Sequence, residues 1–262
     1  MAYPDFINDV TKKEIIWHDG AKMPLGDSED LRSCLERLRN PSLYNQIVPT
    51  YQPGLQAMED AEKNKDDPGR FRVQSFFKKM YGSSKEEVES HLVEIEWLPK
   101  SLQVSLPDGT TTSYKIRVTK INGVSDKLGK ISQELDNLPD TYKKYLANPG
   151  GTYCWRTIAG TDRISAHSFG MTIDINVEYS NYWIWDYKQE QKLPRYFNVR
   201  EDEVDEEQFP RYTNNIPFSI VEIFEKHNFI WGGKWRHYDT MHFEYRPEQF
   251  ATYKIKQQID DN

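Results

Sequence analysis

Hydrophobic residues in the first part of the chain recur mainly with the spacing of an amphipathic helix. In residues 27–38, apolar side chains return every three or four positions, which predicts about three turns of helix. Residues 71–93 predict two further short helices, the second beginning at Ser84 as part of a capping-box pattern. Residues 1–28 are expected to form an extended, weakly structured lead. We therefore predict a mostly helical N-terminal extension over residues 1–95.

The pattern changes character from residue 96 onward, where strand and helix periods alternate. Apolar and polar residues alternate in 102–106 and again in 114–118, and the turn sequence Pro-Asp-Gly between them predicts a β-hairpin. The later predictions, in chain order, are a helix at 124–135, a strand at 171–177, a helix at 216–229 and a strand at 241–245. This order predicts an α+β fold for residues 96–262.

Composition narrows the class of protein. The chain has 262 residues, a mass of 31.0 kDa and 13% aromatic residues, and this aromatic content argues against a disordered chain. Its 34 basic residues are outnumbered by 41 acidic ones, so with a net charge of −7 no nucleic-acid partner is expected. No apolar run approaches the ~18 residues that a membrane span needs. Charged residues are concentrated in 186–213, which we expect to form an exposed loop or lobe.

The sequence leaves the cellular compartment open. The N-terminal residues lack the basic and then apolar pattern of a secretory signal, so the protein is cytosolic or the sequence begins after a removed signal. Cys34 and Cys154 are too few for a disulfide scaffold or a Cys-based zinc finger. These two cysteines could pair with each other, stay free or pack as small apolar side chains.

Three residues in the second half of the chain have the types and order of a zinc ligand set. His167 stands among small and polar residues, and Asp174 follows it within the predicted strand at 171–177, while His242 lies in the last predicted strand. A catalytic zinc ion takes three protein ligands and one water, and two imidazoles with one carboxylate meet that need. Asp239, three positions before His242, is then placed to act as a general base beside the metal.

A purely structural role without a metal is the alternative for these residues. His167 and Asp174 could form a structural hydrogen bond without a metal, and Asp174 could be a solvent-facing strand residue. The place of Asp174 between Ile173 and Ile175 favours a site, because strand alternation turns its side chain away from theirs. If this strand pairs with the strand of His242, all three ligands come together.

Aromatic residues crowd the same region of the sequence. Tyr182 lies in the run YSNYWIWDY after the predicted metal strand, and we consider it part of a wall that contacts substrate. Trp235 follows Gly232 and Gly233, which we expect to form a tight turn that lets Trp235 and Asp239 reach the site. The alternative for most of these aromatic residues is packing in the core.

The residues around the expected ligands resemble the M15 metallopeptidases, the family of zinc D-alanyl-D-alanine carboxypeptidases and L-alanyl-D-glutamate endopeptidases. Residues 165–174, SAHSFGMTID, match its first metal motif, which is Ser-x-His, two residues, Gly, three residues and Asp. The second motif, an acidic residue, two residues and His, corresponds to Asp239 and His242, and its surroundings are similar to the carboxypeptidase branch. The resemblance covers about residues 115–250 and does not include the N-terminal extension.

This resemblance implies a fold and a ligand set. Residues 96–262 would form an M15-like catalytic domain, a small antiparallel sheet with flanking helices. One zinc ion would be held by His167, Asp174 and His242. Asp239 would take a proton from the attacking water and pass it to the leaving amine, at a position where the family often has Glu.

The resemblance also implies further site residues. Arg156 would be the active-site arginine of the family, which stabilises the developing oxyanion or binds the carboxylate of the substrate. Arg163 is the alternative for that role. Ser165 would support His167 or the substrate through a hydrogen bond.

The activity implied by the resemblance is removal of the terminal D-Ala from peptidoglycan stem peptides, or from another D-Ala-containing peptide, by a zinc peptidase. Two alternatives stay open: an endopeptidase that cuts L-Ala–D-Glu or a crosslink, and a catalytically silent scaffold that keeps the zinc site. Because peptidoglycan lies outside the cytoplasmic membrane, we expect the periplasm or the cell surface, with the cytoplasm as the alternative. The sequence does not indicate the oligomeric state.

Overall fold

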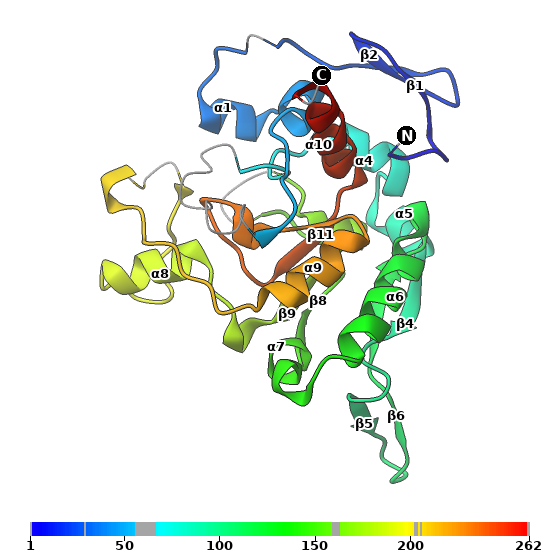
Figure 1. The fold of residues 1–262 in the computed structure, drawn as a ribbon, viewed down its shortest axis with the longest axis vertical. Coiled ribbons are helices and arrows are strands. Elements are labelled where there is room, and N and C mark those ends of the chain that lie inside the picture. The colour runs from blue at the N-terminus through cyan, green and yellow to red at the C-terminus, as the bar shows by residue number, and fades with distance from the viewer. Residues whose placement is uncertain are drawn as a thin grey trace.

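The main sheet of the computed structural model has four antiparallel strands in the order β10-β11-β9-β8 (Figure 1). Their bounds are Pro149–Gly151 for β8, Thr172–Asn176 for β9, Phe229–Trp231 for β10 and His242–Tyr245 for β11. The structure describes residues 2–28, 30–55, 67–158, 163–201, 204 and 206–260. Small antiparallel sheets with helices around them confirm the predicted α+β class.

Three smaller antiparallel sheets accompany the main one. They comprise β1 (Ile7–Val10), β2 (Glu14–Trp17) and β3 (Lys22–Pro24); β4 (Leu92–Glu96) with β7 (Lys115–Thr119); and β5 (Gln103–Ser105) with β6 (Thr111–Ser113). The α-helices within the described residues are α1 (Cys34–Arg39), α2 (Leu43–Ile47), α4 (Gln74–Tyr81), α5 (Lys85–Ser90), α6 (Val124–Asp136), α7 (Lys143–Leu146), α8 (Trp183–Glu190), α9 (Phe218–Lys226) and α10 (Pro247–Asp260).

Strand alternation gives the main sheet one apolar face and one polar face. In the register between β9 and β11, Ile173 pairs with Phe243 and Asp174 pairs with His242. Because neighbouring residues of a strand point to opposite faces, the two apolar residues lie on one side and the two polar ones on the other. Helix α9 lies against this sheet (Figure 1). It packs on the apolar face, where the ring of Phe224 stacks on Phe243 with 3.8 Å between ring centroids. The polar face is thereby left for chemistry.

The N-terminal extension differs from the mostly helical segment that the sequence predicts. Residues 1–28, expected to be a weakly structured lead, contain the antiparallel meander β1-β2-β3, in which Ile15 and Trp17 are buried. These strands have only three or four residues each, too few for a period-2 pattern to stand out. The turn signal was Asp19-Gly20, in which Gly20 adopts φ +80° and Asp19 accepts a hydrogen bond from the amide of Ala21.

The helices of the extension are present but begin at other places than expected. The helix predicted over 27–38 begins only at Cys34, because Ser33 and Glu36 form the capping box that starts α1. The pair predicted in 71–93 is observed as α4 and α5, with Ser84 as the N-cap of α5 as expected. Residues 92–96, however, form strand β4. The extension is thus a mixture of helices and strands.

The extension and the remainder of the chain share one hydrophobic core. The predicted boundary after residue 95 falls inside β4, which pairs along its whole length with β7. Tyr3 and Trp17 pack their rings against Phe76, and Phe77 of the same helix contacts Phe169 near the main sheet. All five of these aromatic side chains belong to a single buried cluster, so the two parts of the chain are packed as one body.

The predicted hairpin is wrong in its second strand. Strand β5, within 102–106, pairs with β6 at Thr111–Ser113, whereas the predicted partner 114–118 falls mostly in β7, which pairs with β4. Part of the segment 186–213, expected as a charged loop or lobe, belongs to helix α8. Cys154 is an exposed free thiol. Among the residues described, no helix combines the length and the apolar character that crossing a membrane requires.

The stacking of α9 on the main sheet provides a first prediction. Replacing Phe224 with Ala removes a fully buried ring and leaves a cavity against Phe243, which we expect to lower the free energy of unfolding by about 3–5 kcal/mol. Urea unfolding followed by circular dichroism measures this change. The control is Tyr196→Ala, whose side chain is 89% exposed and should change stability by no more than about 0.5 kcal/mol. Equal stability of the two variants would contradict this packing.

Candidate metal centre

His167 is held in place by a short 3-10 helix between two loops, Ala166–Phe169. Ser165 caps this turn, because its hydroxyl accepts a hydrogen bond from the backbone N–H of His167 at 3.3 Å. Gly170 ends it with φ +65°, a conformation that glycine adopts without strain. A Cβ at this position would also lie 2.6 Å from a methyl carbon of Leu92 and 3.2 Å from the backbone nitrogen of Thr119, so the packing against β4 and β7 also favours glycine here.

The three predicted metal ligands meet at one point on the polar face of the main sheet. The pairing of β9 with β11 sets Asp174 beside His242, and the turn before β9 brings His167 to the same carboxylate. Nε2 of His167 lies 3.2 Å from Oδ2 of Asp174, and Nδ1 of His242 lies 3.0 Å from Oδ1. Ligand atoms of a tetrahedral zinc site with bonds of ~2 Å are separated by about 3.3 Å. The donor set therefore fits a zinc ion.

The outer nitrogen of each imidazole faces a group that can only accept a hydrogen bond. Nδ1 of His167 lies 3.2 Å from the carbonyl oxygen of Thr152, and Nε2 of His242 lies 3.2 Å from a carboxylate oxygen of Glu244. Both outer nitrogens must therefore carry a proton and donate it. The lone pairs are left for the nitrogens that face Asp174, which is the arrangement that metal-binding histidines use.

Charges around the centre favour an ionised Asp174 and a protonated His242 in the metal-free protein. Burial opposes ionisation of Asp174, but the adjacent His167 and His242 outweigh it and hold the pKa of this carboxyl below its usual range. Burial also opposes the charge on His242, yet its hydrogen bonds to Asp174 and Glu244 raise its pKa to about 9. A metal ion must displace this proton, because it binds the same nitrogen.

Asp239 lies next to the three ligands without joining their hydrogen bonds. It sits at the end of the β10–β11 connection, where its N–H donates to the carbonyl of Gly232 at 3.1 Å and it forms a β-bridge with Tyr182. Burial and the nearby charge of Asp174 raise the pKa of Asp239 to about 7, although His242 and two arginines act in the opposite direction. Its Oδ1 is buried and has no hydrogen-bond partner within the described part of the chain. This oxygen is available to a substrate or a water molecule.

The ligands and Asp239 lie in one cleft of about 460 Å³. Several basic side chains line it, from both the N-terminal extension and the C-terminal half: Arg70, Arg72, Arg156, Arg163 and Lys188. The acidic lining residues are Asp174 and Asp239. Arg70 and Arg72 are ion-paired with Glu201 and Glu244, so it is chiefly the exposed Arg156 that favours an anionic ligand at the cleft.

The other expected site residues all line this cleft, in different settings. Arg156 is exposed, and its guanidinium donates to the carbonyl of Thr157 at 3.4 Å. Tyr182 is half-buried, and burial together with the charge of Asp239 raises the pKa of its hydroxyl. Trp235 is 4% exposed, packs on the ring of His242 at 5.8 Å and donates its indole N–H to a backbone carbonyl. The Trp235 side chain therefore contacts the protein core more than the open cleft.

Sequence reasoning did not single out the residues that support these side chains. Ser168 is fully buried and fixes the backbone of Arg156, because its hydroxyl exchanges two hydrogen bonds of 2.9 Å with it. Glu244 could have been found, since a residue two positions after His242 on a strand shares its face. Arg72 and the carbonyl of Thr152 come from distant parts of the chain, and no local pattern indicates them.

Comparison with known proteins agrees with the geometry. Residues 159–245 match a family model described as D-alanyl-D-alanine carboxypeptidase, and this match supports membership of the M15 peptidase family. The matched range contains all three ligands and Asp239, and excludes the N-terminal extension. The M15 peptidases are zinc-dependent and act on peptidoglycan-related substrates. No curated protein and no solved structure matches the chain.

The protonation of His242 generates a second prediction. Near pH 7 the metal-free site holds a proton on His242, because its pKa is about 9. We expect zinc binding to release about one proton per ion at this pH, and zinc affinity to increase as the pH rises toward about 9. Calorimetric titration with zinc in buffers of different ionisation enthalpy measures the release.

Two variants identify the source of that proton. Asp239→Asn removes a neighbouring carboxyl whose pKa is about 7, and the proton release from His242 should persist in this variant. His242→Gln should lose both the proton release and the tight binding. Unchanged zinc affinity in His242→Gln would contradict its assignment as a ligand.

Proposed function

From this site and its M15 signature, we propose that the chain is a zinc-dependent peptidase that removes the terminal D-Ala from peptidoglycan stem peptides. The observation that carries the proposal is the meeting of His167, Asp174 and His242 beside a buried, unpartnered oxygen of Asp239 in one cleft. A catalytically silent scaffold would not need an acidic side chain beside the three ligands in the same cleft.

Each protein group has a separate task in the proposed reaction. A bound zinc ion supplies a Lewis acid that activates water and polarises the scissile carbonyl. Oδ1 of Asp239 accepts the proton of the attacking water and then delivers it to the departing amine. In the metal-free protein, burial and the charge of Asp174 raise the pKa of Asp239 to about 7. The positive charge of a bound zinc ion would lower this pKa, so that the carboxylate is ionised near neutral pH and can accept the proton.

Substrate recognition is assigned to the basic side of the cleft. Arg156 is the candidate for binding the terminal carboxylate of the peptide, because its guanidinium is exposed at the lining and makes one long hydrogen bond of 3.4 Å to the carbonyl of Thr157. Tyr182 is the candidate for a second polar contact with the substrate, because the charges of Asp239 and Arg156 both act on its hydroxyl. An endopeptidase would not need a carboxylate at this position, which makes Arg156 the residue that separates the two activities.

The location of the protein follows from this substrate. Peptidoglycan lies outside the cytoplasmic membrane, so we propose that the enzyme acts in the periplasm or at the cell surface. A cytoplasmic role on recycled cell-wall peptides is the alternative.

A third prediction concerns the general base. Asp239→Asn keeps the shape of the side chain but cannot accept the water proton, and we expect kcat to fall by about 10²–10⁴-fold. The assay incubates a synthetic stem pentapeptide with purified protein, with and without zinc, and identifies the products by mass spectrometry. The matched control is Asp108→Asn, which alters an exposed carboxylate in the turn between β5 and β6 and should keep full activity.

The products of the same assay decide between the candidate activities. Zinc-dependent loss of one terminal D-Ala supports a carboxypeptidase. A cut at L-Ala–D-Glu or at a crosslink would make the protein an endopeptidase. No product from zinc-loaded protein, with either the pentapeptide or whole peptidoglycan, would contradict the proposed activity.

A fourth prediction concerns Arg156. Replacing it with Gln removes a charge-assisted hydrogen bond to the terminal carboxylate, and we expect kcat/KM to fall by about 10–100-fold, mainly through KM. A substrate with an amidated C-terminus lacks that carboxylate and should be cleaved equally poorly by wild type and variant. If wild type cleaves the amidated and free peptides equally well, Arg156 does not bind a carboxylate.

A further inference from the structure

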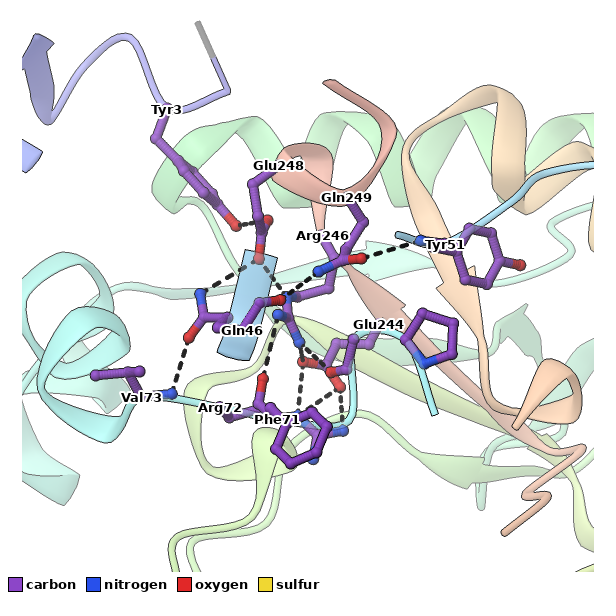
Figure 2. A network of polar contacts seen from close by, with 12 residues as sticks. Tyr3, Gln46, Tyr51, Phe71, Arg72, Val73, Glu244, Arg246, Glu248 and Gln249 are labelled. Atoms are coloured by element: carbon purple, nitrogen blue, oxygen red, sulfur yellow. Dashed lines mark hydrogen bonds and ion pairs between the residues drawn. The ribbon is translucent and has the colours of Figure 1, made fainter. Parts of the chain in front are cut away.

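A buried carboxylate behind the metal centre connects it to the N-terminal extension. Glu244 lies on the same face of β11 as His242, is fully buried, and accepts the outer N–H of that imidazole. Two guanidinium groups balance its charge (Figure 2). Arg246 follows two positions later, whereas Arg72 belongs to the extension, and its Nε lies 2.8 and 2.9 Å from the two carboxylate oxygens.

The segment that carries Arg72 is fixed to the sheet along its whole length. We call residues 67–72 the strap. Its carbonyl groups at Gly69 and Phe71 accept hydrogen bonds from Arg246, and the carbonyl of Pro68 accepts one from Trp235 at 2.8 Å. At its beginning Asp67 accepts from the amide of Arg236 at 2.7 Å.

Close packing also determines where the strap runs. Gly69 adopts φ +86°, and a Cβ there would lie 2.3 Å from the side chain of Ile230 in β10. The positive φ and the close contact with Ile230 both favour glycine at this point of the strap. This close contact brings Arg72 over Trp235, at 5.9 Å from the ring, and this indole in turn packs on His242.

We propose that Glu244 and Arg72 are positioning residues of the metal centre, and that the N-terminal extension completes this centre through the strap. The inference rests on the proposed zinc site. Glu244 holds the imidazole of His242 so that Nδ1 faces the metal position, and Arg72 holds Glu244. Hydrogen bonds to the outer nitrogen of a ligand histidine fix its ring orientation and typically change metal affinity or activity by about 10–100-fold when removed.

The arrangement distinguishes this role from simple stabilisation. An ion pair that served only the fold would have no need to end on a metal ligand. Arg70 offers that comparison, because it lies in the same strap and forms a bidentate pair with Glu201 at 2.6 and 2.7 Å, with no contact to His242. Both arginines line the cleft, and both join the extension to a carboxylate in the C-terminal half.

The test compares Arg72→Gln with the matched control Arg70→Gln in the full-length protein. The zinc dissociation constant is measured by competition with a chromophoric chelator, and the visible spectrum of the cobalt-substituted protein reports ligand geometry. Urea unfolding of the metal-free proteins measures stability separately. We expect Arg72→Gln to weaken zinc binding by roughly 10–100-fold and to shift the cobalt bands, while Arg70→Gln leaves both unchanged.

Other outcomes overturn the inference in distinguishable ways. If Arg72→Gln and Arg70→Gln lose similar stability and both bind zinc as tightly as wild type, the strap serves the fold alone. If wild type itself binds no zinc, the proposed function fails together with this inference. Zinc bound tightly by wild type and by Arg72→Gln alike overturns only the inference.

A conservative variant keeps the test decisive where Arg72→Gln folds poorly. Arg72→Lys retains a positive charge beside Glu244 but lacks the planar fork that contacts both of its oxygens. We expect its zinc affinity to lie between those of wild type and Arg72→Gln, with metal-free stability close to wild type. Wild-type cobalt bands and wild-type zinc affinity in this variant would show that the fork does not position Glu244, contrary to our proposal.

Discussion

The burial of Glu244 is the constraint around which much of the molecule is arranged. A carboxylate removed from water is costly unless it is paired, and here two guanidinium groups and one imidazole surround it. Arg246 in turn needs the carbonyls of the strap and the carboxylate of Glu248, which also accepts the hydroxyl of Tyr3 (Figure 2). One buried charge therefore joins the first residues of the chain, the strap, the last strand and the final helix.

The sequence predicts the residues of the candidate site more completely than the residues that hold their side chains in place. Ser165, His167, Asp174 and the Asp239–His242 pair lie in two short segments, so their spacing indicates chemistry directly, and β9–β11 pairing assembles them as expected. The groups that hold these side chains come from elsewhere. Their partners are set by tertiary packing, which local periodicity does not encode.

For the fold too, the elements with a local apolar period were predicted, and those that depend on distant residues were not. Helices such as α6 and α9 carry repeated apolar positions over several turns, and both were predicted close to their observed bounds. The meander β1-β2-β3 was missed because strands of three or four residues hold too few positions to establish a period. Residues 92–93 of strand β4 were predicted as the end of a helix, since the pairing of this strand with β7 depends on residues 19 to 27 positions away.

The contact between Tyr3 and Glu248 spans almost the entire chain and has a consequence for biosynthesis. Synthesis runs from the N-terminus to the C-terminus, so Tyr3 and the strap are made long before the residues that they contact. The metal centre lacks its second histidine and its buried counter-charge until His242 and Glu244 have been made. A nascent chain that has not reached Glu244 therefore cannot assemble the proposed zinc site, because its contacts are separated by long stretches of sequence.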